Sequence, residues 1–325
     1  GHGTSASVFF LPSNYPPQGA AGPGRLEATS GMGTPDLLGG YGEFTLLTPD
    51  APGRGRRVTG GRLVHLDLAG AKHRAEVQFE GPENFLIDPK KIDGPVQKMS
   101  VPMTIVRDPE RDLVKITVGD QRLLLKRQLW SRWITLSFAT QIPAATALDW
   151  LQAPTSVTGT VRLLVKDVHP KCEIYVSPIN FDPRRPAGPI CQPEGLAQDI
   201  AAKAGCYATL GIPEDHNALQ QEALSEDEFL SQAYLVHDER VDHYRRALAE
   251  FDAGCLFYYF GTTDLVSHVF WRDRDPGHPG RLPALGDRYA HVIDDLYAHI
   301  DQTVGETLDQ LRDEDSLIVL SDHGF

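Results

Sequence analysis

The sequence lacks any apolar run of the roughly 18–20 residues that a membrane-spanning helix needs. It also lacks an excess of positive charge, because 31 Lys and Arg residues stand against 44 Asp and Glu residues. Broad binding to nucleic-acid polymers requires a basic surface, so we expect none. The four cysteines have no CxxC spacing, which argues against a zinc ribbon and leaves free thiols or a disulfide. The first residues lack the basic and apolar regions of a signal peptide, and the sequence assigns no compartment.

What is present is the composition of a globular protein with room for two cores. The chain has 325 residues, of which 41% are hydrophobic and 23% charged. Three zones differ in their patterns. Residues 1–43 are rich in Gly and Pro around one strand-like run at 7–11, residues 44–168 contain short alternating segments, and residues 169–325 combine helical patterns with apolar runs.

The middle zone has the period-two pattern of half-buried strands. In residues 62–70, Val64, Leu66 and Leu68 fall on one face. Similar segments recur at intervals of roughly ten residues, which favours an all-β sandwich-like unit. The segments are 62–70, 74–81, 100–108, 112–120, 121–128, 132–140 and 160–168.

The last zone begins with helical patterns. Residues 195–205 predict a short helix that is closed by Gly205. Ser225 followed by Glu228 is the signature of a capping box, which predicts that a long helix begins there. Its apolar positions keep the spacing of three and four residues that is typical of one buried stripe.

Two apolar runs in this zone predict strands. Residues 255–260 are continuously apolar, as expected for a strand that is buried on both faces, and the segment SLIVL at 316–320 predicts another buried strand. A second amphipathic helix is predicted between them, with apolar positions from Val292 to Leu311. The order strand, helix, strand predicts a parallel sheet with helices packed on it.

Side chains of metal-ligand type follow both predicted strands. Asp264 and His268 come after the first strand, and a helical turn there would put them on one face within reach of one cation. Asp322 and His323 come after the second strand, where the chain bends and the two side chains can diverge towards two ions. Carboxylate and imidazole ligands suit zinc, with manganese or iron as alternatives. Each pair also has a simpler interpretation, as a solvated helix face or as a hydrogen-bonded turn.

Three further residues are weaker candidates for substrate binding. Arg272 could contact a phosphate oxygen, and the alternative is a surface ion pair. His278 could line the cleft, and the alternative is an exposed loop histidine. Asp36 lies on a Gly-rich loop, and the alternative is a turn-forming aspartate.

Two long motifs resemble a known family. GTTDLVSHVFWRD at 261–273 and IVLSDHGF at 318–325 are similar to motifs of the type I phosphodiesterase/nucleotide pyrophosphatase branch of the alkaline phosphatase superfamily. The segments at 30–48 and 173–190 resemble its longer bacterial members. The resemblance implies an α/β/α sandwich interrupted by a β-rich insertion. Residues 1–43 and 169–325 then belong to the α/β catalytic domain, which continues beyond the chain end, and residues 44–168 form the insertion.

The resemblance also implies a reaction. Two divalent ions, usually zinc, serve the family: Asp264 and His268 match ligands of one, and Asp322 and His323 match ligands of the other. A Thr or Ser hydroxyl attacks the phosphorus of a small anionic phosphoester, and water then hydrolyses the covalent intermediate. We expect that nucleophile upstream of residue 1 and a final His ligand beyond Phe325. The 325 residues alone should therefore bind metal weakly and turn over little or no substrate.

Two other functions are compatible with the same residues. A phosphotransferase similar to phosphoglycerate mutase would share a similar metal core but would return the phosphoryl group to a sugar acid. A degenerate relative would bind glycans or proteins through its β-rich unit without catalysis. A hydrolase releases free phosphate, whereas the phosphotransferase yields an isomerised sugar acid, so a product assay distinguishes the two. Metal analysis distinguishes the degenerate relative, because a protein that only binds partners need not retain metal ions.

Overall fold

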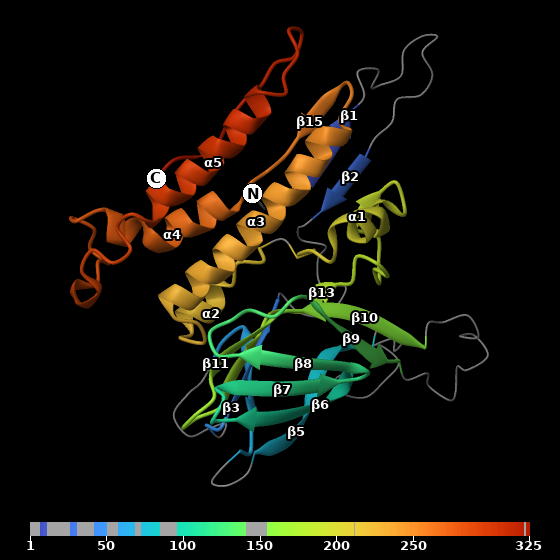
Figure 1. Ribbon diagram of the computed structural model, residues 1–325, viewed down its shortest axis with the longest axis vertical. Coiled ribbons are helices and arrows are strands. Elements are labelled where there is room, and N and C mark those ends of the chain that lie inside the picture. The colour runs from blue at the N-terminus through green and yellow to red at the C-terminus, as the bar shows by residue number, and fades with distance from the viewer. Residues whose placement is uncertain are drawn as a thin grey trace.

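The computed structural model describes residues 7–11, 27–30, 42–50, 58–68, 73–84, 96–140, 155–210, 212–321 and 323–325. These residues form a mixed α/β structure with four sheets and five α-helices. Most strands gather in one half of the molecule and the long helices in the other, with a small sheet beside the helices (Figure 1). The ligand-type side chains that the structure describes, Asp264, His268 and His323, lie on the helical half.

The β-rich half confirms the period-two prediction. One antiparallel sheet has the order β5-β6-β7-β8, and along β5 and β6 buried and exposed residues alternate. A second sheet has the order β11-β12-β3-β4 and a third the order β13-β10-β9. The bounds are β3 (Phe44–Thr48), β4 (Gly61–His65), β5 (Arg74–Glu83), β6 (Lys98–Asp108), β7 (Leu113–Val118), β8 (Gln121–Lys126), β9 (Ile134–Ala139), β10 (Ser156–Val161), β11 (Leu163–Asp167), β12 (Glu173–Val176) and β13 (Asn180–Phe181).

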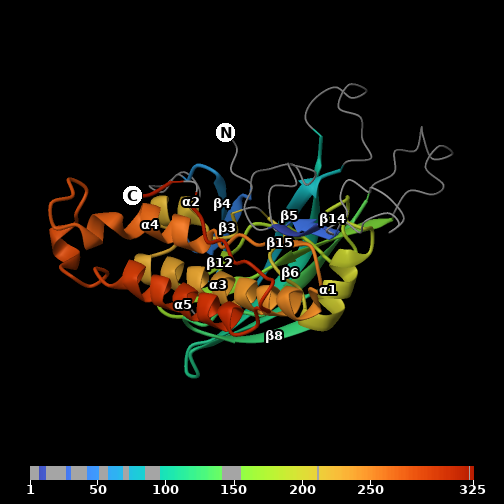
Figure 2. The same cartoon turned by 90° about the horizontal axis from the view of Figure 1, so that it is seen from above.

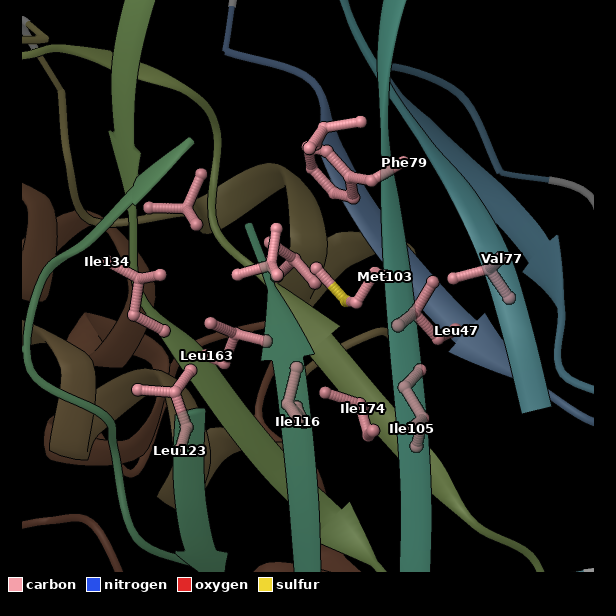
Figure 3. Close-up of a cluster of buried hydrophobic side chains, with 14 of the residues drawn as sticks. Leu47, Val77, Phe79, Met103, Ile105, Ile116, Leu123, Ile134, Leu163 and Ile174 are labelled. Carbon is pink, nitrogen blue, oxygen red and sulfur yellow. The ribbon is translucent and has the colours of Figure 1, made fainter. Parts of the chain in front are cut away.

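The sheet that contains β3 is buried on both faces. Leu47 points into the core between the sheets, where it lies near Ile105 and Val77 (Figure 3). Its neighbour Leu46 points the other way, because successive side chains of a strand alternate, and joins a second apolar cluster with helical residues such as Phe229. This sheet therefore connects the β-rich half to the helices through apolar contacts.

The β-rich half extends past the last predicted strand. β12 lies between β3 and β11, and β13 pairs with β10, although both follow residue 168 in the sequence. Cysteine adds no covalent link, since all four cysteines are free thiols. Burial raises the pKa of the Cys172 thiol to about 12, as expected for a structural residue in the core.

The helical half confirms the predicted helices. Gly205 caps α1, and Ser225 and Glu228 form the expected capping box of α3. In both views α3, α4 and α5 lie side by side (Figures 1 and 2). None of the helices described is long and apolar enough to cross a membrane. The bounds are α1 (Leu196–Ala204), α2 (His216–Gln220), α3 (Glu226–Glu250), α4 (Thr262–Arg274) and α5 (Val292–Leu308), so α5 ends before Leu311.

The sheet of the helical half differs from the prediction. Its order is β14-β2-β1-β15, and every described pair is antiparallel. β15 contains only three of the six residues predicted, and Cys255 and Phe257 within it are exposed. The apolar run correctly indicated a strand, but the sequence of a single strand does not show which strand it pairs with or in which direction. The bounds are β1 (Ser7–Leu11), β2 (Glu27–Ser30), β14 (Cys191–Gln192) and β15 (Cys255–Phe257).

The second predicted strand of this half is absent from the described residues. Residues 316–320 form no strand, and the side chains of Ile318, Val319 and Leu320 are 76%, 68% and 72% exposed. The prediction of a buried strand at 316–320, and of a parallel sheet built on it, was therefore wrong for this structure. An apolar segment becomes a strand only when a neighbour satisfies its backbone groups, and none of the described strands pairs with it.

Candidate metal centre

Helix α4 holds two of the four predicted ligands. Its buried residues include Val266 and Phe270, which pack in the apolar cluster shared with α3 and α5. This stripe fixes the rotation of α4 about its axis. Asp264 and His268 are four residues apart on the adjacent face, as the spacing predicted, and their Oδ1 and Nε2 atoms are 3.3 Å apart.

The third predicted ligand comes from a distant part of the sequence. His323 places its Nε2 atom 3.2 Å from the same Oδ1 atom of Asp264. One ligand atom from each of Asp264, His268 and His323 lies within 4.8 Å of the other two. Two imidazoles thus face one carboxylate oxygen, and residues of the two predicted pairs come together in one cluster.

The donor set and its geometry fit a divalent cation. Asp264 Oδ1 is shielded from solvent and, among the described residues, has no hydrogen-bond donor other than the two imidazole nitrogens at 3.2 and 3.3 Å. When those nitrogens carry no proton, as in a metal site, a shielded carboxylate oxygen is costly unless a cation compensates it. Two ligands bound tetrahedrally to zinc at about 2.0–2.1 Å lie about 3.3 Å from each other. The two separations from Asp264 Oδ1, 3.2 and 3.3 Å, match that value, and all three ligand atoms lie within 4.8 Å of one another.

Aromatic rings surround the cluster on the side of the C-terminal segment. The ring of Phe325 stacks on Trp271 of α4 with centroids 5.7 Å apart. The same ring meets His268 edge-on at 4.8 Å and His323 at 5.2 Å. These contacts hold the end of the described chain against α4 and limit the freedom of both imidazoles.

The start of α4 holds a buried polar network that the sequence patterns do not predict. Thr262 donates a hydrogen bond from Oγ1 to Glu214 Oε1 at 2.6 Å and accepts one from Arg240 Nη1 at 2.9 Å. Arg240 Nη1 also lies 2.8 Å from Glu214 Oε1. The position of Thr262 two residues before Asp264 was the only local signal, because isolated Glu and Arg residues in a sequence usually lie on the surface.

The weaker candidates lie elsewhere or are engaged in other contacts. Arg272 is half-buried and donates to Glu226 Oε1 at 3.0 Å and to Asp273 Oδ2 at 3.3 Å. His278 lies in a turn, where its Nδ1 atom accepts a hydrogen bond from the Gly280 amide at 3.0 Å. Asp36 and Asp322 lie outside the described residues.

Comparison with protein families agrees with the motifs that surround the cluster. The model of the type I phosphodiesterase/nucleotide pyrophosphatase family matches residues 122–325, which is more than half of the chain. The chain therefore belongs to this family of hydrolases. No curated protein and no solved structure matches it. The matched range includes α4, the C-terminal segment and all three residues of the cluster.

Proposed function

We propose that the protein is a metal-dependent hydrolase of phosphoric esters, with Asp264, His268 and His323 as metal ligands. The observation that supports this most strongly is the convergence of two imidazoles on one shielded carboxylate oxygen, at 3.2 and 3.3 Å. Asp322 is the fourth proposed ligand, since it directly precedes His323 in the family motif. The substrate class is a small phosphodiester, nucleotide pyrophosphate or phosphomonoester.

The residues of the cluster have distinct roles in this proposal. Asp264 supplies a negative charge between the two imidazoles, and His268 and His323 supply neutral nitrogen ligands when deprotonated. A divalent ion held there supplies charge neutralisation at the phosphoryl oxygens and acidifies bound water. Two ions about 4 Å apart are the arrangement typical of such reactions, and zinc is the metal that we propose, with manganese or iron as alternatives. We assign the nucleophile to no residue of this chain.

The fold that we propose is the α/β/α sandwich implied by the family resemblance, interrupted by a β-rich insertion. We propose that residues 1–43 and the helical half belong to the catalytic domain. The insertion begins at residue 44, as the sequence indicates. We extend it from 168 to include β12 and β13, because these strands pair with β3, β11 and β10.

Metal binding is the first test of the proposal. Zinc-free protein is titrated with Co²⁺, whose absorption spectrum reports the ligands and the coordination number. We expect Asp264→Asn and His323→Ala each to weaken binding by more than the roughly 10–100-fold that is usual for residues outside the ligand shell. His291→Ala is the matched control, because this exposed imidazole also lies four residues from a carboxylate, at 3.6 Å from Asp295, but has no third ligand-type group beside it in the described part of the chain.

Ester hydrolysis by the same samples is the second test. We expect a slow release of nitrophenol from a nitrophenyl phosphodiester, since no hydroxyl nucleophile is assigned and water must attack in its place. Chelation and Asp264→Asn should both abolish the release. Hydrolysis that survives both changes would contradict the proposed site. Transfer to a sugar acid without free phosphate would indicate a phosphotransferase, and the absence of both metal and ester binding would indicate a non-catalytic relative.

A further inference from the structure

The first residue of α4 is fixed by a buried hydrogen-bonded triangle. Thr262 Oγ1, Glu214 Oε1 and Arg240 Nη1 lie 2.6 to 2.9 Å from one another. All three residues are buried, and Glu214 and Thr262 are 1% and 0% exposed. The triangle joins the start of α4 to the middle of α3 and to the residue that precedes the N-cap of α2.

The segment that leads into α4 is held at a second point by the same residue of α3. Tyr258 donates a hydrogen bond from its hydroxyl to the backbone oxygen of Arg240 at 2.8 Å. Arg240 therefore has two contacts with this part of the chain. Its side chain binds Thr262, the first residue of α4, and its backbone oxygen binds Tyr258 in the segment before α4. The path of residues 258–262 is fixed relative to α3 before the two ligands on α4 begin.

Folding stability alone does not explain why the triangle contains the buried ion pair between Arg240 and Glu214. A charged pair in the interior must be desolvated, and apolar residues of similar volume often replace such pairs without loss of stability. Glu214 has one further carboxylate oxygen, Oε2, that is buried without a donor among the described residues. An arrangement of this kind is better explained by the geometry that it imposes than by the free energy of folding.

The triangle fixes the first turn of α4, and this turn carries the proposed metal ligand Asp264. Asp264 lies two residues after Thr262, in the same helical turn, and His268 lies one turn further along the rigid helix. Metal–ligand distances tolerate deviations of only about 0.2 Å. A small displacement of the first turn of α4 therefore moves the Asp264 carboxylate out of ligand range, although no residue of the triangle touches the cluster.

We propose that Glu214, Arg240 and Thr262 form a positioning network that sets the first turn of α4 and thereby presents Asp264 to the metal. This role rests on the metal centre proposed above. The residues are positioning residues, because they act through Asp264 and contact neither substrate nor metal. Their removal should change metal affinity and ligand geometry without removing any ligand.

The experiment compares two substitutions of Thr262 in the full chain by Co²⁺ titration and absorption spectroscopy. Thr262→Val keeps the shape and removes the hydroxyl, and we expect it to weaken Co²⁺ binding by about 10–100-fold and to change the spectrum, as for other residues outside the ligand shell. Thr262→Ser keeps the hydroxyl and should restore both. Glu214→Gln is the second variant if Thr262→Val does not fold, and it should weaken binding in the same direction.

The control is a buried threonine of the β-rich half whose hydroxyl also donates to a glutamate. Thr48 on β3 is buried, and its Oγ1 atom donates a hydrogen bond to Glu173 Oε1 at 2.9 Å. Thr48→Val should lower the melting temperature by a similar amount and leave Co²⁺ binding unchanged. Equal melting temperatures for the two valine variants together with unchanged Co²⁺ binding in Thr262→Val would overturn the positioning role. A wild-type chain that binds no Co²⁺ would instead remove the metal centre itself, and the positioning role with it.

Discussion

The two segments that bring ligands to the cluster differ sharply in how they are held. Helix α4, which carries Asp264 and His268, is held in place by a buried apolar stripe and a buried polar network. The segment 316–325 carries His323 but exposes most of its apolar side chains, and its main contacts with α4 are aromatic. Two of the proposed ligands are thus held by a packed helix, and the third lies on a segment with few buried contacts.

The largest expected effect comes from the anchored side. Phe270 is fully buried and packs against Tyr289 and Phe229, with ring centroids 5.2 and 6.2 Å apart. We expect Phe270→Ala to lower the free energy of unfolding by about 3–5 kcal/mol, because it leaves a cavity beside α4. Urea denaturation measures the change. Phe325→Ala on the segment 316–325 is the matched variant and should lower the free energy of unfolding by about 1 kcal/mol or less. Equal losses in the two variants would show that the two segments are held equally firmly.

Acidification should lower the free energy of unfolding by a smaller amount, through a buried histidine of α3. His237 of α3 is buried, and its burial lowers the pKa of its imidazole. The unfolded chain, with a histidine pKa of about 6.5, then binds a proton that the folded chain does not. This contribution to stability is complete above about pH 6.5 and is lost as the pH falls towards the folded pKa, by at most about 1.4 kcal/mol per pH unit.

His237→Gln removes this contribution and leaves that of His243, whose pKa is also lowered by burial. Unfolding free energies measured by urea at pH 7, 6 and 5 should therefore fall less steeply in the variant than in the wild type. His291→Gln, at an exposed position, should keep the wild-type slope. A variant slope equal to that of the wild type would show that His237 takes no part.

The smallest effect is expected on the weakly packed segment. Ile318 is mostly exposed, so Ile318→Asp should change the free energy of unfolding by no more than about 0.5 kcal/mol. Ile105→Asp in the core of β6 provides the contrast and should prevent stable folding, because it buries a charge without a partner. A loss of several kcal/mol for Ile318→Asp would show that residues 316–320 are buried as a strand after all.

The features that the sequence predicted correctly are those that depend on neighbouring residues. Alternation along β5 and β6, the capping box at Ser225 and the spacing of Asp264 and His268 are all properties of short segments. The pairing of β15 with β1 depends on residues far apart in the chain, and an apolar run does not encode its partner. The buried network of Glu214 and Arg240 was missed for the same reason, since its charges are compensated only by the tertiary structure.

Adjacent residues of α3 contact two different parts of the molecule. Glu239 accepts hydrogen bonds from Arg162 and Trp133 of the β-rich half, each at 2.8 Å, while Arg240 binds Thr262 at the start of α4. Consecutive helical residues are about 100° apart around the axis, so a single turn is clamped from both directions. Thermodynamic linkage requires any coupling through this turn to be reciprocal. A cation bound at the proposed site could therefore stabilise the contacts of Glu239 only to the extent that those contacts raise the affinity for the cation.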